Sequence, residues 1–166
     1  CGFGHVSVLK WWKSSGLEIK RATKAIDDAS ANGHIAVLEW WKGSGLAWKY
    51  TNLVFDGASE NGHLEVLEWL KKFGSPSRRT ENAMDLASKN GHVDILKWWK
   101  ATGLTVKNTC YSMYWASENG HVEVLMWWKE NSLSLKYTSN AIDWASGQGH
   151  VDVLIWWEES GLELKY

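Results

Sequence analysis

Histidine is the side chain of this sequence with the clearest capacity for chemistry. The six histidines share one position of a pattern that recurs every 29 residues: His5, His34, His63, His92, His121 and His150. Such a column could bind metal ions or relay protons. Neighbouring helix layers are about 8–10 Å apart, whereas a zinc–nitrogen bond is about 2 Å, so two rings cannot share one ion. We therefore expect each ring to hydrogen-bond the backbone at a turn, and we expect no metal and no cofactor.

Carboxylates form a second periodic set, which Tyr114 interrupts: Asp27, Asp56, Asp85 and Asp143. A basic residue ends each unit: Lys20, Lys49, Arg78, Lys107, Lys136 and Lys165. Catalysis requires groups that converge on one site, and an even column disperses them. Because the sequence also lacks a nucleophile–base set, a phosphate-binding glycine loop and a Cys/His metal spacing, it predicts no catalytic residue and no enzyme. We expect each aspartate to pair with a lysine or a backbone amide of a neighbouring unit.

These columns belong to a repeat that organises the whole chain. The motif GHVDVLIWW at 149–157 has five earlier versions, each opening with glycine 29 residues before the next. A fixed period of this size is the signature of a stacked repeat array. The predicted single array over 1–166 comprises a partial unit 1–21 and full units 22–50, 51–79, 80–108, 109–137 and 138–166. Because the chain starts inside a unit and without methionine, we expect a fragment, a processed product or part of a longer array.

Each full unit predicts two helices. A threonine opens four of the units and is a favourable N-cap, and apolar residues then follow at helical spacing. Glycine ends the first helix by supplying a left-handed conformation, and the second helix starts near the histidine. We expect this structural role for five Gly-His pairs: Gly33 and His34, Gly62 and His63, Gly91 and His92, Gly120 and His121, and Gly149 and His150.

The repeated motif resembles a known family. Ala-Ser-x-x-Gly-His-Val-x-Val-Leu, a large apolar pair and a second glycine twelve residues after the first are similar to the ankyrin repeat. The resemblance covers all five full units and the partial one. It implies an all-α, ankyrin-like solenoid of paired antiparallel helices. Ankyrin units have about 33 residues, so the shorter period here implies that their β-hairpin finger is reduced to a short extended connector. The family's Thr-Pro-Leu-His opening is also absent.

Tryptophan is unusually abundant, with 14 residues. Most of them form two adjacent columns of the second helix, and adjacent helical residues point about 100° apart. One column aligns with a buried leucine of the ankyrin pattern, and we expect it in the core: Trp41, Trp99, Trp128 and Trp157. We expect the neighbouring Trp127 column to be partly exposed at the edge of the stripe. A stacking platform for carbohydrate or nucleobases is the alternative to packing.

Positions that break the repeat are free to contact partners. In the first helix, two such positions resemble the concave, partner-facing surface of ankyrin repeats. The candidate partner-binding residues are Tyr111, Tyr114, Trp115, Trp144, Asp28 and Lys24. Tyrosine and tryptophan are favoured interface anchors, although these side chains could instead fill the core beside the missing finger. The irregular segment 75–79 could form a bend or a local basic contact.

Together these features predict a non-catalytic protein-binding scaffold. A formal net charge of −1 leaves no basic footprint for nucleic acid, and no apolar run approaches the length of a membrane span. We expect no small-molecule substrate. Two cysteines in distant units, Cys1 and Cys110, favour a reducing, intracellular and cytoplasmic location. The alternative is a structural protein that self-associates through its repeat ends into a filament or lattice, because the last unit keeps the apolar columns and lacks a polar cap.

Overall fold

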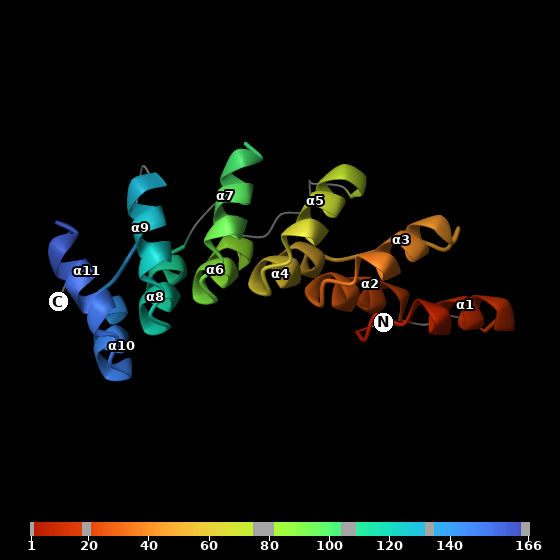
Figure 1. Ribbon diagram of the computed structural model, residues 1–166, viewed down its shortest axis with the longest axis horizontal. Helices are drawn as coiled ribbons and strands as arrows, with labels where there is room; N and C mark the ends of the chain where they lie inside the picture. The colour runs from red at the N-terminus through yellow and green to blue at the C-terminus, as the bar shows by residue number, and fades with distance from the viewer. Residues whose placement is uncertain (1, 18–20, 75–81, 104–108, 132–134, 164–166) are drawn as a thin grey trace. The chain divides into compact units, whose positions relative to one another are not determined.

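The computed structural model describes residues 2–17, 21–74, 82–103, 109–131 and 135–163 (Figure 1). Within these ranges the chain forms eleven α-helices and no strand. They are α1 (Val6–Ser15), α2 (Ala22–Ala31), α3 (Ile35–Gly43), α4 (Leu53–Glu60), α5 (Leu64–Phe73), α6 (Asn82–Lys89), α7 (Val93–Ala101), α8 (Tyr111–Glu118), α9 (Val122–Asn131), α10 (Asn140–Gln148) and α11 (Val151–Glu159). The prediction of five helix pairs preceded by one leading helix is therefore confirmed.

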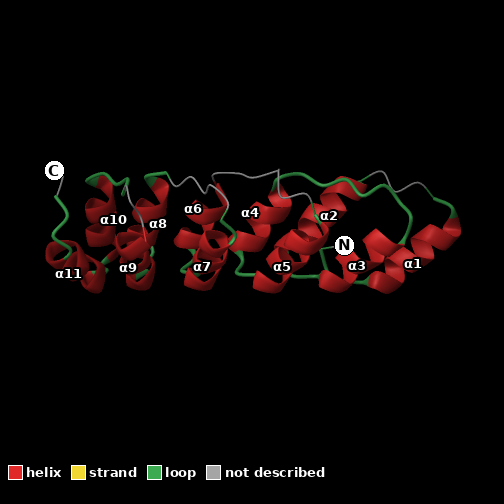
Figure 2. Cartoon of the chain, turned by 90° about the horizontal axis from the view of Figure 1, so that it is seen from above, coloured by secondary structure: helices red, strands yellow, loops and turns green. Residues whose placement is uncertain are grey.

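The helices belong to two compact units, Cys1–Thr80 and Glu81–Tyr166. In the first unit, the first helices α2 and α4 pack together in one layer, while α3 contacts α1 and α5 in the other (Figure 2). In the second unit, α8 packs between α6 and α10, and α9 contacts α7 and α11. The boundary between the units lies one residue after the predicted repeat boundary at 79/80, and one uninterrupted array over 1–166 stays a prediction.

The Gly-His pair owes its regularity to a helix-ending hydrogen-bond pattern. At the end of α2, the amide of His34 donates to the carbonyl of Ala29 at 2.8 Å, and the amide of Gly33 donates to Ser30 at 3.3 Å. This pattern is a Schellman motif, which requires a left-handed residue at the position of Gly33, where φ is +72°. The same pair of bonds ends α4, α6, α8 and α10. Each motif thereby turns the chain directly into its second helix.

Small and aliphatic columns form the core of each unit. One alanine of each first helix is fully buried, which lets the first helices approach closely: Ala29, Ala58, Ala87, Ala116 and Ala145. Contact is close at Gly57, where an added Cβ would lie 2.7 Å from the Cβ of Ala31. The second helices contribute a fully or almost fully buried aliphatic pair in four of the units: Val37 and Leu38, Val66 and Leu67, Ile95 and Leu96, and Val124 and Leu125.

The tryptophan columns differ in one respect from the expectation. The column of Trp41, Trp99, Trp128 and Trp157 is buried. The second column is buried as well in three units, at Trp69, Trp98 and Trp127, with Trp127 only 7% exposed. Within the Trp127–Trp128 pair, the ring centroids lie 5.0 Å apart at 81°. This edge-to-face packing lets both indoles lie within the apolar stripe. The predicted partial exposure of this column is therefore wrong at Trp69, Trp98 and Trp127 and is confirmed at Trp40 and Trp156, which are half-buried.

The connectors were predicted to be extended with one face buried. Leu135, Lys136, Leu162 and Glu163 are in neither helix nor strand. The remaining connector residues of those two units, and the whole irregular segment 75–79, lie outside the described residues.

Candidate protein-binding surface

The histidines link consecutive repeats. The Nε2–H of His34 donates to the carbonyl of Gly2 in the preceding repeat at 3.0 Å, and His121 bonds the Lys89 backbone, again 32 residues earlier. Each of these rings also covers a glycine of the preceding repeat, so that a Cβ on Gly91 would lie 2.9 Å from Nδ1 of His121. The histidine therefore acts as a wedge between two turns. No cluster suited to a metal ion lies among the described His, Cys, Asp and Glu side chains.

Burial between the turns affects the protonation of His121. The pKa of this imidazole is lowered, chiefly by burial, while His92 and His150 add smaller contributions in the same direction. The Lys89 backbone bond and Glu123 act in the opposite direction. The neutral ring is therefore favoured, which suits a donor to one carbonyl better than a charged general acid.

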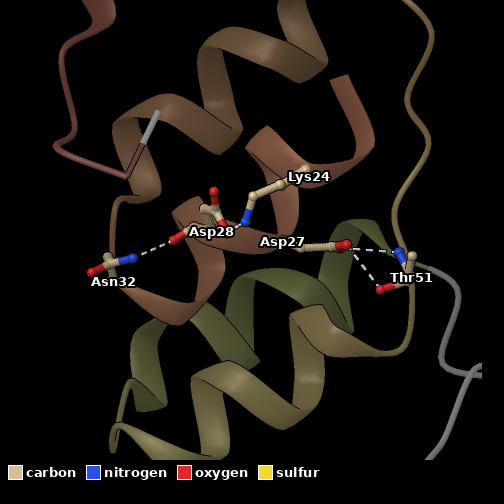
Figure 3. A network of polar contacts seen from close by, with 5 residues as sticks. All are labelled: Lys24, Asp27, Asp28, Asn32 and Thr51. Atoms are coloured by element: carbon tan, nitrogen blue, oxygen red, sulfur yellow. Dashed lines mark hydrogen bonds and ion pairs between the residues drawn. The ribbon is translucent and has the colours of Figure 1, made fainter. Parts of the chain in front are cut away.

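Aspartates also join neighbouring repeats. Asp27 accepts the amide of Thr51 at 3.0 Å and its hydroxyl at 2.9 Å (Figure 3), and Asp85 accepts the same two groups of Thr109. The Thr51 hydroxyl oxygen accepts the amide of Leu53, the first residue of α4, at 3.1 Å. Pairing with a backbone amide of the neighbouring unit is thus present at Asp27 and Asp85. The carboxylates are committed to helix starts rather than to a catalytic site.

A third link between repeats, which was not predicted from the sequence, joins tryptophan to serine. Trp128 Nε1 donates to the buried Ser88 hydroxyl at 2.9 Å, and Trp157 Nε1 donates to that of Ser117 at 3.0 Å. Both pairs are 40 residues apart. The residue 40 positions after Ser30 is Leu70, and the buried Ser30 hydroxyl has no hydrogen-bond partner among the described residues. Since the leucine side chain carries no N–H donor, this junction cannot form the equivalent side-chain bond.

The serine column provides a matched pair of substitutions. We expect Ser88→Ala to lower the free energy of unfolding by about 1–3 kcal/mol, the cost of leaving a buried donor such as Trp128 Nε1 unpaired. Ser30→Ala removes an unpaired buried hydroxyl and should leave stability unchanged or higher. Both changes gain the same helix propensity, so the difference between their chemical-denaturation midpoints isolates the hydrogen bond. Equal midpoints would contradict the link.

The candidate aromatic residues form a continuous group on α8 and α10, here named the aromatic surface and comprising Tyr111, Tyr114, Trp115 and Trp144. Tyr111 stacks on Trp115 with centroids 5.1 Å apart at 26°. Tyr114 meets Tyr111 edge-on at 6.2 Å and Trp144 edge-on at 6.4 Å. Tyr111 is 52% exposed and Trp144 is 46% exposed. These two rings therefore remain at the surface rather than filling the core.

Charge around the aromatic surface is mixed. Lys89 Nζ lies 5.7 Å from the Trp115 ring centroid, within cation–π range. The pKa of the Tyr114 phenol is raised, first by burial and then by Glu118 and Tyr111, so its hydroxyl remains protonated at neutral pH. The surface therefore offers stacked rings, a hydroxyl donor and a cation.

The other two candidate residues lie in the first compact unit. On α2, the exposed Lys24 and the half-buried Asp28 form an ion pair with each other at 2.9 Å (Figure 3). The Asp28 backbone carbonyl also accepts the side-chain amide of Asn32 at 2.7 Å. Because Lys24 and Asp28 pair internally, they present less free charge than the sequence suggested.

Comparisons with known proteins agree with this architecture. The family model of ankyrin repeats in many copies matches residues 55–98. The crystal structure of the human ASB11 ankyrin repeat domain is similar with a TM-score of 0.72 and 17% sequence identity, covering 99% of this chain and 83% of that one. The chain therefore has the fold of an ankyrin repeat domain, and residues 55–98 match the ankyrin repeat family itself. No curated protein matches its sequence.

The ankyrin repeats indicate a protein-interaction scaffold, a type of domain that is typically non-catalytic. Among the described helices, none combines the length and the apolar character needed to cross a membrane.

Proposed function

We propose that this ankyrin repeat protein binds a protein partner on the aromatic surface of α8 and α10. The observation that carries the proposal is the exposure of Tyr111 and Trp144 on helices whose repeated positions are otherwise committed to packing. The buried residues at the repeated positions stabilise the fold, and core packing does not require the exposed rings of Tyr111 and Trp144. Large aromatic rings of this kind dominate the binding energy of protein interfaces.

Ring packing supports this proposal because it restricts the side chains before binding. Tyr111 is held against Trp115, and Tyr114 contacts both Tyr111 and Trp144. A partner that binds rings already held in place loses less side-chain entropy than one that binds free rings. Lys24 and Asp28 are proposed as a secondary, polar contact, because an exposed ion pair contributes only about 0–1 kcal/mol.

Alanine substitutions test the proposal. We expect Tyr111→Ala, Trp115→Ala and Trp144→Ala each to weaken affinity by about 2 kcal/mol or more, or roughly 30-fold. The partner is first obtained by affinity capture with the intact chain, and its affinity for each variant is then measured by calorimetry. Thermal denaturation should change much less for Tyr111→Ala and Trp144→Ala, since both rings are largely exposed.

Leu53→Ala is the matched control. Leu53 is an exposed apolar residue of α4 at the repeat position that Tyr111 occupies in α8. Its truncation should leave affinity unchanged. A partner that binds all three aromatic variants as tightly as the unaltered chain would exclude the aromatic surface as the binding site.

End-to-end association of chains is a second candidate function. Ser146 and Asp143 are exposed on α10, whereas the equivalent Ser88, Ser117 and Asp85 are buried. The repeat of α10 and α11 thus exposes groups that are buried at the junctions between the other repeats, and a further repeat packed against this face would bury them, whether it belongs to this array or to another chain.

A further inference from the structure

Hydrogen-bond donors on the aromatic surface have no acceptor within the described part of the chain. Tyr111 and Tyr114 carry phenol O–H groups, and Trp115 and Trp144 carry indole N–H groups. None of these four side chains donates a hydrogen bond to another described residue. The buried indole of Trp128, in contrast, donates to a serine of another repeat. The aromatic surface therefore has donors available for the acceptors of a partner.

The part of the aromatic surface on α8 is flanked by repeats. Helix α8 packs between α6 and α10 (Figure 2), and Tyr111 on α8 is still 52% exposed. Its exposure therefore does not depend on the absence of a neighbouring repeat. From α6, Lys89 Nζ lies 5.7 Å from the Trp115 ring centroid. This ammonium also has no hydrogen-bond acceptor among the described residues, so it adds a further donor beside the rings.

Apolar residues occupy the same repeat position on these consecutive first helices: Leu86 on α6, Trp115 on α8 and Trp144 on α10. Leu86 and Trp115 are half-buried, so each presents part of its side chain to solvent. Packed helices lie about 8–10 Å apart, and one three-residue turn of a polyproline II helix advances about 9 Å. A polyproline II segment that crosses the helices would therefore place every third residue on the next member of this row.

The chemistry of the aromatic surface distinguishes among the ways in which proteins bind peptides. A helical peptide uses its carbonyls in its own hydrogen bonds, and an added strand needs a sheet edge, whereas the described residues form no strand. Phosphorylated peptides are bound by clustered arginines, and no arginine follows Arg79. A proline-rich segment has carbonyl acceptors, lacks N–H donors at its prolines and docks on aromatic side chains. Only this last mode uses both the rings and the donors.

We propose that the aromatic surface binds a proline-rich segment of the partner in the polyproline II conformation. This inference rests on the proposed function and names the chemistry of the partner. Proline rings would pack on Tyr111 and Trp115, while carbonyls of the segment would accept the hydrogen bonds of Tyr111, Tyr114 and Trp115. The segment would cross α6, α8 and α10 along the row that begins at Leu86. Because polyproline II is formed before binding, little conformational entropy would be lost.

Decaproline with blocked ends is the probe, because it offers only rings and carbonyls and makes roughly three polyproline II turns. Titrated into the ¹⁵N-labelled full chain, it should shift the indole N–H signals of Trp115 and Trp144 in a saturable manner. The signal of the buried Trp128 should stay in place. A blocked ten-residue glycine–serine peptide is the control, since it has as many carbonyls but no rings and no preformed conformation. Absence of shifts with decaproline, or equal shifts with the control peptide, would overturn the proposal.

Tyr111→Phe tests the donor directly, because it keeps the ring and removes only the O–H group. It should weaken decaproline binding roughly 2- to 10-fold, the contribution of one hydrogen bond. Met126→Lys is the matched control, since Met126 is exposed on α9 and lies outside the aromatic surface, and this variant should bind decaproline like the unaltered chain. Unchanged affinity in Tyr111→Phe would contradict the assigned role of the phenol.

The partner captured with the intact chain separates this inference from the proposed function. Decaproline should compete with that partner for the chain. If the partner loses affinity for Tyr111→Ala and Trp144→Ala but decaproline does not compete, the aromatic surface binds a segment of another class, and only the present inference is wrong. If the partner binds both variants as tightly as the unaltered chain, the proposed function fails with it.

Discussion

Truncating Trp128 to alanine is expected to lower the free energy of unfolding by about 3–5 kcal/mol, the range for removing a large buried aromatic ring. The indole is 4% exposed and packs edge-on against Trp127. Its loss would leave a cavity and would also remove the donor to the buried Ser88 hydroxyl. Chemical denaturation measures the change as a lower midpoint at an unchanged slope.

Trp11→Ala is the control for this prediction. Trp11 occupies the column of Trp127 but is 63% exposed on α1, so its truncation should change stability by no more than about 0.5 kcal/mol. Trp127→Ala should approach the loss of Trp128→Ala, because Trp127 is also buried. Similar midpoints for the Trp11 and Trp128 variants would show that burial does not set the contribution of these tryptophans to stability.

Features that depend on a few consecutive residues could be predicted from the sequence. The helix pairs follow from apolar spacing and from glycine at each helix end, and the Schellman bonds at Gly33 and His34 require only six neighbouring residues. Their outcome is local because the left-handed turn and its two hydrogen bonds join residues of a single repeat.

Contacts between repeats were harder to predict, for a physical reason. In a strict 29-residue repeat, every set of equivalent residues recurs with the same spacing. The sequence therefore does not show which sets contact each other. The bond from Trp128 to Ser88 spans 40 residues, which is one period plus the distance between two columns. The signal that could have found it is the exception at Leu70, where the loss of tryptophan coincides with an unpaired Ser30 hydroxyl.

The aromatic surface shows the same limit. The sequence identified Tyr111, Trp115 and Trp144 because they break the repeat, yet it left open whether they fill the core. That question depends on how far α8 and α10 cover each other, which no single repeat encodes. Trp127 was misplaced for the same reason, since its burial requires the tertiary packing of neighbouring second helices.

Replacing Gly120 by alanine is the second change with a large expected effect. Its φ of +78° is left-handed, and an L-residue there costs about 1–2 kcal/mol. The new methyl would also meet His150, whose Nδ1 lies 2.8 Å from the Cβ position, and overpacking of this kind costs about a further 1–3 kcal/mol. Gly149→Ala carries the backbone cost alone, because it has the same conformation and an open Cβ position. The difference between the two denaturation midpoints therefore measures the histidine wedge. If Gly120→Ala and Gly149→Ala lower the free energy of unfolding equally, the His150 ring moves aside at no energetic cost. The turn then requires glycine only for its left-handed backbone conformation.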